Sequence, residues 1–431
     1  MCLETRRTLF KRIIPALGAG VTSFAAVSKQ NTAAGAASAV SAEDDAFLND
    51  LEHANFLYFL EQASASTGLV RDRANVRTPV ASVLSSIAAT GFGLTALCIG
   101  HYRNFISYTD ARDRVLATLR FLWTKLSNHR GFFYHWADVN TGERLWDSEV
   151  SSVDTAILLC GVLTCRMHFR HAEITRLALD IFNRVEWSWL SEDTPLLPHG
   201  WSPEIGFLPY RWDYYSELMM MYLLGLGSST HPLPLEAWTG WKRTVFEYDG
   251  LRYIGSFAPL FVHQYSQAWF DLRGKRDKYA DYFQNSVTAT EVHRRFCLEL
   301  ASQFPDYTDD LWGITASDSQ HGYVVWGGPP QMGPIDGSVV PSAAAGSLVF
   351  MPQATLRVLK NMKNRYGNRS WCRYGFVNAF NPLKNWYDTD VVGIDTGITM
   401  VMIENLRTGF VWDTFMRNRE ARRGIERAGL K

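Results

Sequence analysis

The stretch VASVLSSIAATGFGLTALCIGHY, residues 80–102, decides the fold. Its side chains are apolar or small at nearly every helical position, so a helix built from it has no polar face for water and belongs inside. The next segment, TDARDRVLATLRFLWTKLS (109–127), is amphipathic and offers Thr109 or Asp110 as N-cap. A buried helix followed by an amphipathic one indicates an inner and an outer layer of helices.

The same alternation recurs along the chain. Residues 151–169 are apolar nearly throughout, whereas residues 44–64 and 174–190 are amphipathic. Helical periodicity also marks residues 211–232, 256–272, 279–304, 341–366 and 397–418. The pattern predicts an all-α protein, an (α/α)6 toroid with an inner and an outer helix ring and a few short β-hairpins. An open α-solenoid is the alternative architecture, but no fixed sequence repeat supports it.

One stretch, GFFYHWADVNTGERL (131–145), alternates and carries a turn signal at NTG, which predicts a β-hairpin. Long loops rich in Gly, Pro, Trp and Asp cover residues 198–213, 307–341 and 374–397. Long ordered loops in a compact domain are usually functional, and in a toroid they gather at one end.

The N-terminus has the features of an export signal. Arg6 and Arg7 precede a Gly- and Ala-rich apolar run, an arrangement that resembles a twin-arginine signal. SAVSA ends at Ala42 with small residues where a signal peptidase favours them. We expect a signal over residues 1–42, one catalytic domain over 43–431, and a periplasmic location. No later segment is expected to be long and apolar enough to span a membrane, and no membrane insertion is expected once the signal is removed.

The amino-acid composition limits the classes of partner that we expect for this protein. The chain carries 43 basic and 43 acidic residues, so a nucleic-acid partner is not expected. Aromatic residues make up 13% of the chain, which favours either sugar stacking or simply an aromatic core. Outside the signal lie five cysteines, an odd number, which we interpret as core residues and not as a disulfide framework. A monomer is expected.

Candidate acids occur in two places. Glu217 lies on a Met- and Leu-rich helical stripe one turn after Asp213, and burial there would suit a general acid. Asp147 and Glu149 lie in the loop before the apolar segment 151–169, and Asp154 falls in its first turn. With Ser151 or Ser152 as N-cap, Asp154 has a purely structural interpretation as well.

Motifs for other chemistries do not occur. The histidines lack metal-site spacing, and the sequence has no HExxH, GxSxG, P-loop or dinucleotide fingerprint, so we expect neither a metal nor a cofactor. Carboxylates beside aromatic loops point to glycoside hydrolysis by an acid/base pair.

Several ordered blocks resemble the bacterial glucoamylase-like domain family, which includes the endo-β-1,2-glucanases. They are SEVSSVDTAILLCGVL (148–163), GFLPYRWDYYSELMMMYLLGLGSSTHP (206–232), LWGITASDSQHGY (311–323), DGSVVPSAAAGSLVFMPQ (336–353), YGFVNAFNP (374–382) and VVGIDTGITMVMIENLRTG (391–409). The resemblance spans most of the chain after the signal. It implies an (α/α)6 barrel, no metal and inverting hydrolysis of β-1,2-glucan, a polysaccharide or oligosaccharide substrate.

The resemblance also suggests roles for residues. Glu217 lies in the block of the family's proposed acid, and Glu149 matches its acidic SE element. Family members often have GIDQG where this chain has GIDTG around Asp395, which places one sugar contact in doubt. The base is expected among Asp147, Glu149, Asp154 and Asp395, with the acid and base carboxylates about 6.5–9.5 Å apart or more. The expected substrate contacts are Trp146, Trp212, Asp213, Trp312, Asp318, Tyr323, Trp326 and Asp336.

Two other functions remain open on the sequence. A transglycosylase or an exo-acting β-1,2-glucooligosaccharide enzyme would use the same scaffold, and a glycan-binding toroid without turnover would use the same cleft. A polysaccharide lyase is disfavoured because the sequence offers no clear basic cluster for a uronic acid.

Overall fold

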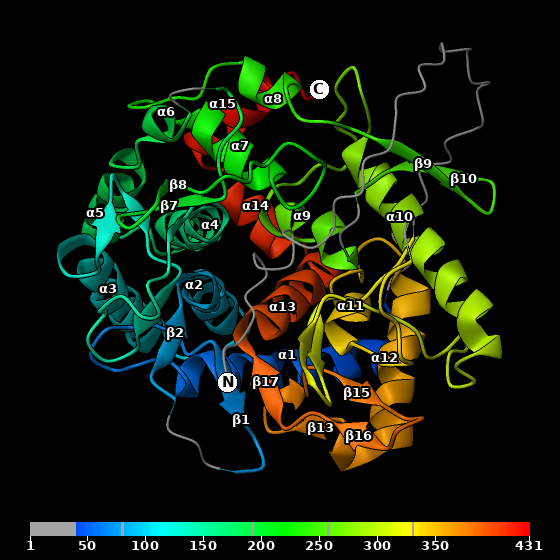
Figure 1. Cartoon of the computed structure of the whole chain (residues 1–431). Coiled ribbons are helices and arrows are strands. Elements are labelled where there is room, and N and C mark those ends of the chain that lie inside the picture. The colour runs from blue at the N-terminus through cyan, green and yellow to red at the C-terminus, as the bar shows by residue number, and fades with distance from the viewer. Residues whose placement is uncertain (1–39, 79–81, 192–193, 257–258, 330–331) are drawn as a thin grey trace.

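The protein is described by a computed structural model over residues 40–431 apart from 79–81, 192–193, 257–258 and 330–331 (Figure 1). Residues 1–39 of the predicted signal therefore lie outside the described residues. The described helices are α1 (Ala42–Glu61), α2 (Ile87–Tyr102), α3 (Tyr108–Thr124), α4 (Ser152–Phe169), α5 (Ala172–Asn183), α6 (Trp187–Leu190), α7 (Met219–Gly227), α8 (Glu236–Thr239), α9 (Tyr265–Trp269), α10 (Tyr282–Glu299), α11 (Pro341–Ala345), α12 (Pro352–Tyr366), α13 (Gly393–Arg407), α14 (Phe410–Phe415) and α15 (Arg419–Arg427). Short 3-10 helices cover Leu260–His263, Leu300–Ser302 and Gly367–Arg369.

The strands are all short. They are β1 (Arg73–Asn75), β2 (Leu84–Ser86), β3 (Asn128–His129), β4 (Phe132–Phe133), β5 (Trp136–Asp138), β6 (Val150–Ser151), β7 (Gly200–Ser202), β8 (Gly206–Phe207), β9 (Val245–Tyr248), β10 (Leu251–Ile254), β11 (Ser317–Ser319), β12 (Gly322–Val324), β13 (Trp371–Cys372), β14 (Gly375–Phe376), β15 (Phe380–Asn381), β16 (Trp386–Tyr387) and β17 (Asp390–Val392). Most pair with a neighbour in sequence, but β2 pairs with β5 and β1 pairs with β17.

The helices form a helical barrel, as the sequence predicted (Figure 1). Helices α2, α4 and α7 are buried on almost every side, whereas α3, α5 and α12 bury one stripe each. In Figure 1, α3, α5, α10 and α12 lie toward the outside of the ring, and α2, α4 and α13 lie nearer its middle. The all-apolar helices therefore line the inside, because they have no polar face to present to water.

Glycine sets the distance between α2 and α4. A Cβ on Gly161 would lie 2.1 Å from the carbonyl oxygen of Gly91, and a Cβ on Gly91 would lie 2.5 Å from that of Ile157. Only hydrogen at these two positions lets the two backbones approach this closely.

Three inner helices share one construction at their N-terminal ends. Strand β2 leads directly into α2, β6 into α4, and β17 into α13. The strands tie these ends to one another, because Ile87 N–H at the start of α2 donates to His135, and Gly393 N–H at the start of α13 donates to Asp72. The loops and first turns at these helix starts therefore meet on one face of the barrel.

The structure corrects several expected helices. Among its described residues, the segment 256–272 holds only a 3-10 helix and α9, and the segment 397–418 divides into α13 and α14. The segment 211–232 becomes helical only at Met219, because its earlier backbone groups pair elsewhere: Trp212 N–H donates to Leu197 and Tyr215 N–H donates to Lys242. The expectation that Asp213 and Glu217 share one helical face is therefore wrong. The segment 341–366 divides into α11 and α12, and α12 begins at Pro352, whose ring disfavours a helical conformation in the residue before it.

The N-cap expected at Thr109 or Asp110 is wrong: α3 begins at Tyr108 and its N-cap is Ser107, whose Oγ accepts from Asp110 N–H. Two other expectations hold. The hairpin predicted over 131–145 is present, with Ala137 paired to Arg144 across the Asn-Thr-Gly turn. All five cysteines outside the signal are free, and all but Cys372 are buried.

Among the described helices, α4 alone meets the length and apolarity of a membrane span, contrary to the expectation that no later segment would. Its apolar window is 89% buried inside the barrel, which is the environment of a core helix.

Candidate active site

Glu217 lies in the turn immediately before α7. The residue is 5% exposed, and its backbone carbonyl accepts a hydrogen bond from Ser266 Oγ of α9 at 2.8 Å. Ser266 Oγ also accepts from Met220 N–H, which fixes the first turn of α7 against α9. The sequence located Glu217 correctly at the start of the apolar stripe, but in a turn and not within the helix.

A second acidic group lies at the start of α4. Ser151 is the N-cap: its Oγ accepts from Asp154 N–H at 3.0 Å and donates to Asp154 Oδ2 at 2.5 Å. His135 lies between the acids, with Nδ1 3.2 Å from Glu149 Oε1 and Nε2 3.6 Å from Asp154 Oδ2. The structure thus brings together two of the predicted carboxylates through a histidine that the sequence did not single out.

The loop that carries Trp146 and Asp147 has unusual backbone angles. The two residues have φ values of +58° and +48°, in the left-handed region that non-glycine residues rarely adopt. Trp146 is 57% exposed, and its ring meets Trp136 edge-on at 6.0 Å. Trp136 in turn stacks on His135 at 3.9 Å. Strain of this kind tends to persist where a loop must present a side chain for function.

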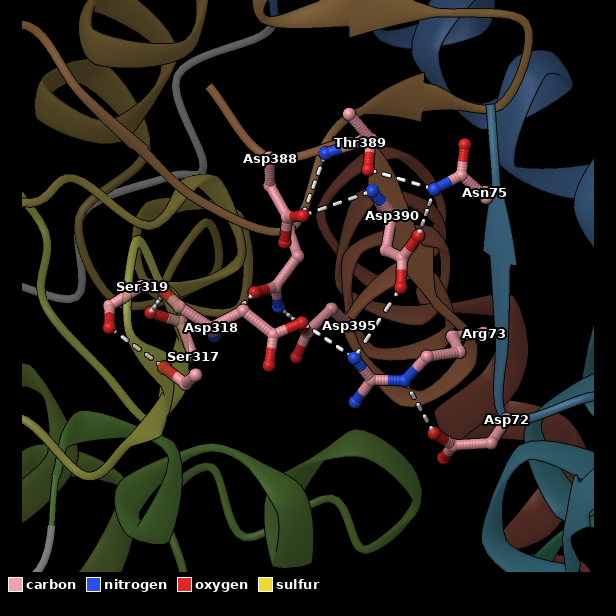
Figure 2. Close-up of polar contacts among 12 residues, drawn as sticks. Asp72, Arg73, Asn75, Ser317, Asp318, Ser319, Asp388, Thr389, Asp390 and Asp395 are labelled. Atoms are coloured by element: carbon pink, nitrogen blue, oxygen red, sulfur yellow. Dashed lines mark hydrogen bonds and ion pairs between the residues drawn. The ribbon is translucent and has the colours of Figure 1, made fainter. Parts of the chain in front are cut away.

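A third group surrounds Arg73 on β1. Its guanidinium lies 2.6 Å from Asp318 Oδ2, 3.2 Å from Asp72 Oδ2 and 3.5 Å from Asp390 Oδ2. Figure 2 shows these carboxylates around Arg73, with Asp388 and Asp395 in the same cluster. The strand pairing of β1 with β17 places Asp390 opposite Asn75, so segments from three distant parts of the chain converge here.

Asp388 is the most perturbed acid of this cluster. Its Oδ1 accepts from Thr389 N–H at 2.7 Å and from Asp390 N–H at 3.1 Å. Burial and, after it, the negative charge of Asp318 raise its pKa to about 7, although the backbone donors lower it. Asp388 therefore holds a proton over a wider pH range than an exposed aspartate does.

Asp395 lies in the first turn of α13, where a carboxylate suits the helix dipole. Asn378 Nδ2 donates to Asp395 Oδ2 at 2.6 Å, and Asn378 Oδ1 accepts from Asp318 N–H at 2.8 Å. Asn378 therefore connects the β11 hairpin to the start of α13. Asp395 and Asn378 also line a small pocket between α1, α11 and α13.

The two other predicted polar contacts, Asp213 and Asp336, each lie beside a lysine of the protein. Asp213 is half-buried, and burial raises its pKa although Lys242 Nζ lies 3.8 Å from its carboxylate. Asp336 forms an ion pair with Lys384 at 2.7 Å, and its pKa is lowered because this lysine and Ser338 outweigh the effect of burial.

The predicted aromatic contacts differ in how far their side chains are exposed to solvent. Trp312 is completely buried, which leaves no ring face for a sugar and contradicts that prediction. Trp212 and Trp326 are also buried, and their indole N–H groups donate to Ser152 and Ser317. Tyr323 is partly exposed on β12, and Trp146 is the most exposed of the predicted aromatics.

Five ionisable residues of these groups were missed in the sequence: Asp72, Arg73, His135, Asp388 and Asp390. The YDTD run before the GIDTG block is an acidic signal that could have indicated Asp388 and Asp390. Nothing local marks the others, because strand pairing alone brings them to the helix starts. Among the described residues, no group of three or more His, Cys, Asp or Glu side chains is arranged to hold a metal ion.

Comparison with known proteins identifies relatives. The family model described as "Putative glucoamylase" matches residues 209–419. An exo β-1,2-glucooligosaccharide sophorohydrolase (non-reducing end) of Parabacteroides distasonis is 28% identical over 423 residues, covering 89% of this chain. The chain spans 58% of the length of that curated relative.

Solved structures of other proteins match this structure along nearly the whole chain. An endo-β-1,2-glucanase from Chitinophaga pinensis, in complex with sophorotriose and glucose, matches with a TM-score of 0.85 at 28% identity, covering 91% of this chain and 99% of that one. A β-1,2-glucanase from Parabacteroides distasonis matches with a TM-score of 0.84 at 28% identity, covering 90% and 60%. With the helical barrel and the acidic groups at its inner-helix starts, these matches show that the chain is similar to glucoamylase-like proteins along nearly its whole length.

Proposed function

We propose that the protein is a glycoside hydrolase that cleaves β-1,2-glucan by an inverting acid/base mechanism. One observation carries the proposal: the chain aligns over about nine-tenths of its length with enzymes whose names specify β-1,2-linked glucans. The carboxylates at the inner-helix starts support it, because inverting hydrolysis needs two carboxyl groups.

Glu217 is the proposed general acid. It is buried at the start of an apolar helix, where a protonated carboxyl costs less than an ionised one. Inverting enzymes keep a water between acid and base, so we retain the expected carboxylate separation of about 6.5–9.5 Å or more as part of the proposal.

The proposed base is Glu149, with Asp395 as the other candidate. A base must be ionised and must reach water. The side chain of Glu149 is 15% exposed and faces His135, and Asp395 is partly exposed and accepts from Asn378. The other two candidates are less suited. Asp154 accepts a hydrogen bond from the N-cap residue Ser151, and Asp147 is exposed in the loop that carries Trp146.

The test is a screen of purified protein on glucans of different linkage, with products identified by chromatography and the anomer by NMR. We expect cleavage of β-1,2-glucan with inversion. Glu217→Gln should lower kcat by about 10²-fold or more, the range a general acid contributes. Wild-type activity in Glu217→Gln would remove it as the acid, and binding without turnover by the wild type would favour the glycan-binding alternative.

The lengths of the glucan products distinguish endo cleavage, exo cleavage and glycosyl transfer. Short and long products from long glucan indicate endo cleavage, whereas disaccharide alone indicates the exo mode of the curated relative. A lack of net reducing-end release would indicate transfer.

We further propose six inner and six outer helices, export to the periplasm through the twin-arginine-like segment, and a monomer that uses neither a metal nor a cofactor. The alternation of apolar and amphipathic segments supports the first, and the sequence around Arg6 and Arg7 supports the second. Fractionation of cells that produce the chain with Arg6 and Arg7 replaced by Lys tests export.

A further inference from the structure

His135 lies between two acids from different elements. It immediately precedes β5, Glu149 immediately precedes β6, and Asp154 lies in the first turn of α4. The two ring nitrogens face the two carboxylates, at 3.2 Å and 3.6 Å. All three side chains are largely buried, with exposed fractions of 8% for His135, 15% for Glu149 and 8% for Asp154.

The arrangement favours a charged ring. A neutral imidazole has one N–H and one lone pair, so one of the two carboxylates would face a lone pair. An imidazolium has an N–H at both nitrogens, so it can donate to Glu149 and form an ion pair with Asp154, each contact then joining opposite charges. The face of Trp136, stacked 3.9 Å away with rings within 15° of parallel, also suits a cation.

Main-chain hydrogen bonds hold the backbone of His135 on both sides. His135 N–H donates to the Glu149 carbonyl at 2.9 Å, and the His135 carbonyl accepts from Ile87 N–H at the start of α2. His135 is thus held by the hairpin on one side and by an inner helix on the other. With its backbone held in this way and its ring stacked on Trp136, His135 can orient the Glu149 side chain through Nδ1.

We propose that His135 is a positioning residue that orients Glu149 through Nδ1 and keeps it ionised, while Nε2 anchors the ring to Asp154. The inference rests on the proposed function, because Glu149 is the proposed base. An oriented, ionised base raises kcat and has little effect on the binding of glucan, because it acts on the attacking water.

Two substitutions separate the two ring nitrogens. The amide nitrogen of Asn occupies nearly the position of Nδ1, so His135→Asn keeps a donor for Glu149 and loses the one toward Asp154. The amide nitrogen of Gln lies nearer the position of Nε2, so His135→Gln keeps the donor for Asp154 and loses the one toward Glu149. Both variants remove the charge and are similar in polarity.

We expect His135→Gln to lower kcat by about 10²-fold with KM within about threefold, and His135→Asn to retain about ten times the activity of His135→Gln. Thermal unfolding measured alongside gives the folded fraction of each variant. The matched controls are His53→Asn and His53→Gln on α1, since His53 is exposed on an outer helix and both should keep wild-type kinetics. Equal activity of the two His135 variants, or losses that follow the unfolded fraction, would overturn the proposal.

A second measurement needs no substrate. In protein with ¹⁵N-labelled histidine, the signals missing from His135→Gln report the wild-type ring, and we expect both nitrogens to be protonated at pH 7. A neutral tautomer would contradict the bridge. If the wild type cleaves another glucan, the β-1,2 assignment fails and the Asn–Gln comparison is made on that glucan. If it cleaves none, the proposed function fails, and the nitrogen signals alone decide whether His135 bridges the two acids.

Discussion

Burial changes the pKa of Asp388 more strongly than the neighbouring charges and backbone donors do. Its pKa in the folded protein is raised to about 7, whereas an unfolded aspartate titrates near its ordinary value of about 3.9. The folded state therefore binds more protons than the unfolded state between these two values, so this carboxyl makes the protein less stable as the pH rises from about 4 to 7.

Asp388→Asn removes this titration. The amide oxygen can still accept from Thr389 and Asp390 N–H, so we expect the variant to be more stable than the wild type at pH 8, with the difference shrinking toward pH 4. Melting temperatures of the two proteins from pH 4 to pH 8 check this. A difference that does not depend on pH would mean that Asp388 is ionised in the folded protein throughout the range.

At the scale of residues, the sequence identified acids that lie beside an apolar helix. Glu217, Glu149 and Asp154 were found this way, because a carboxyl next to an inner helix stands out in a one-dimensional pattern. His135 and Arg73 were not found, because each precedes or lies on a short strand with no pattern of its own. Their partners come from segments distant in sequence.

At the scale of elements, the crossing of α2 and α4 depends on two glycines. In Gly161→Ala the new Cβ would overlap the backbone carbonyl of Gly91, and neither helix backbone can move without disturbing the inner ring. We expect the free energy of unfolding to fall by about 3 kcal/mol or more, the upper part of the range for overpacked cores. Chemical denaturation measures it.

Gly328→Ala is the matched control. A Cβ there has no heavy atom closer than 3.9 Å, the Nδ1 of His293, so its effect should stay within about 0.5 kcal/mol. Similar losses in the two variants would show that the close approach of α2 and α4 is not what Gly161 permits.

The sequence predicted which segments are helical better than where each helix begins. Segment 211–232 has apolar periodicity from end to end, yet residues before Met219 pair with loops around Leu197 and Lys242. Local propensity is small beside such tertiary hydrogen bonds, so the helix starts late and Glu217 lies at its edge.

At the scale of the whole molecule, a buried charge network joins the first helix to the last inner one. Arg407 of α13 contacts Glu52 at 2.6 Å and Asp45 at 2.8 Å, both on α1. Arg103, after α2, contacts Glu404 at 2.6 Å and Glu52 at 3.4 Å. Burial and the nearby charge of Glu404 raise the pKa of Glu52 well above its ordinary value, which favours the protonated form of Glu52.

Arg407→Met should lower the free energy of unfolding by about 3–5 kcal/mol, because it leaves buried carboxylates without their cation. Glu52→Gln should cost less than half as much, because Glu52 already favours its neutral form. Denaturant unfolding at pH 7 compares the two variants. A larger loss in Glu52→Gln than in Arg407→Met would show that Glu52 is ionised and that its charge stabilises the fold.

The sequence by itself determined the layers of this protein. Segments apolar on all sides, such as 87–102 and 152–169, must lie inside, and amphipathic segments must cover them, so a helical barrel follows from burial alone. The composition of the sites was decided by tertiary structure. Strands of two or three residues pair across the chain and bring Asp72, His135 and Asp388 to the inner-helix starts, and such pairing depends on distances that no local pattern encodes.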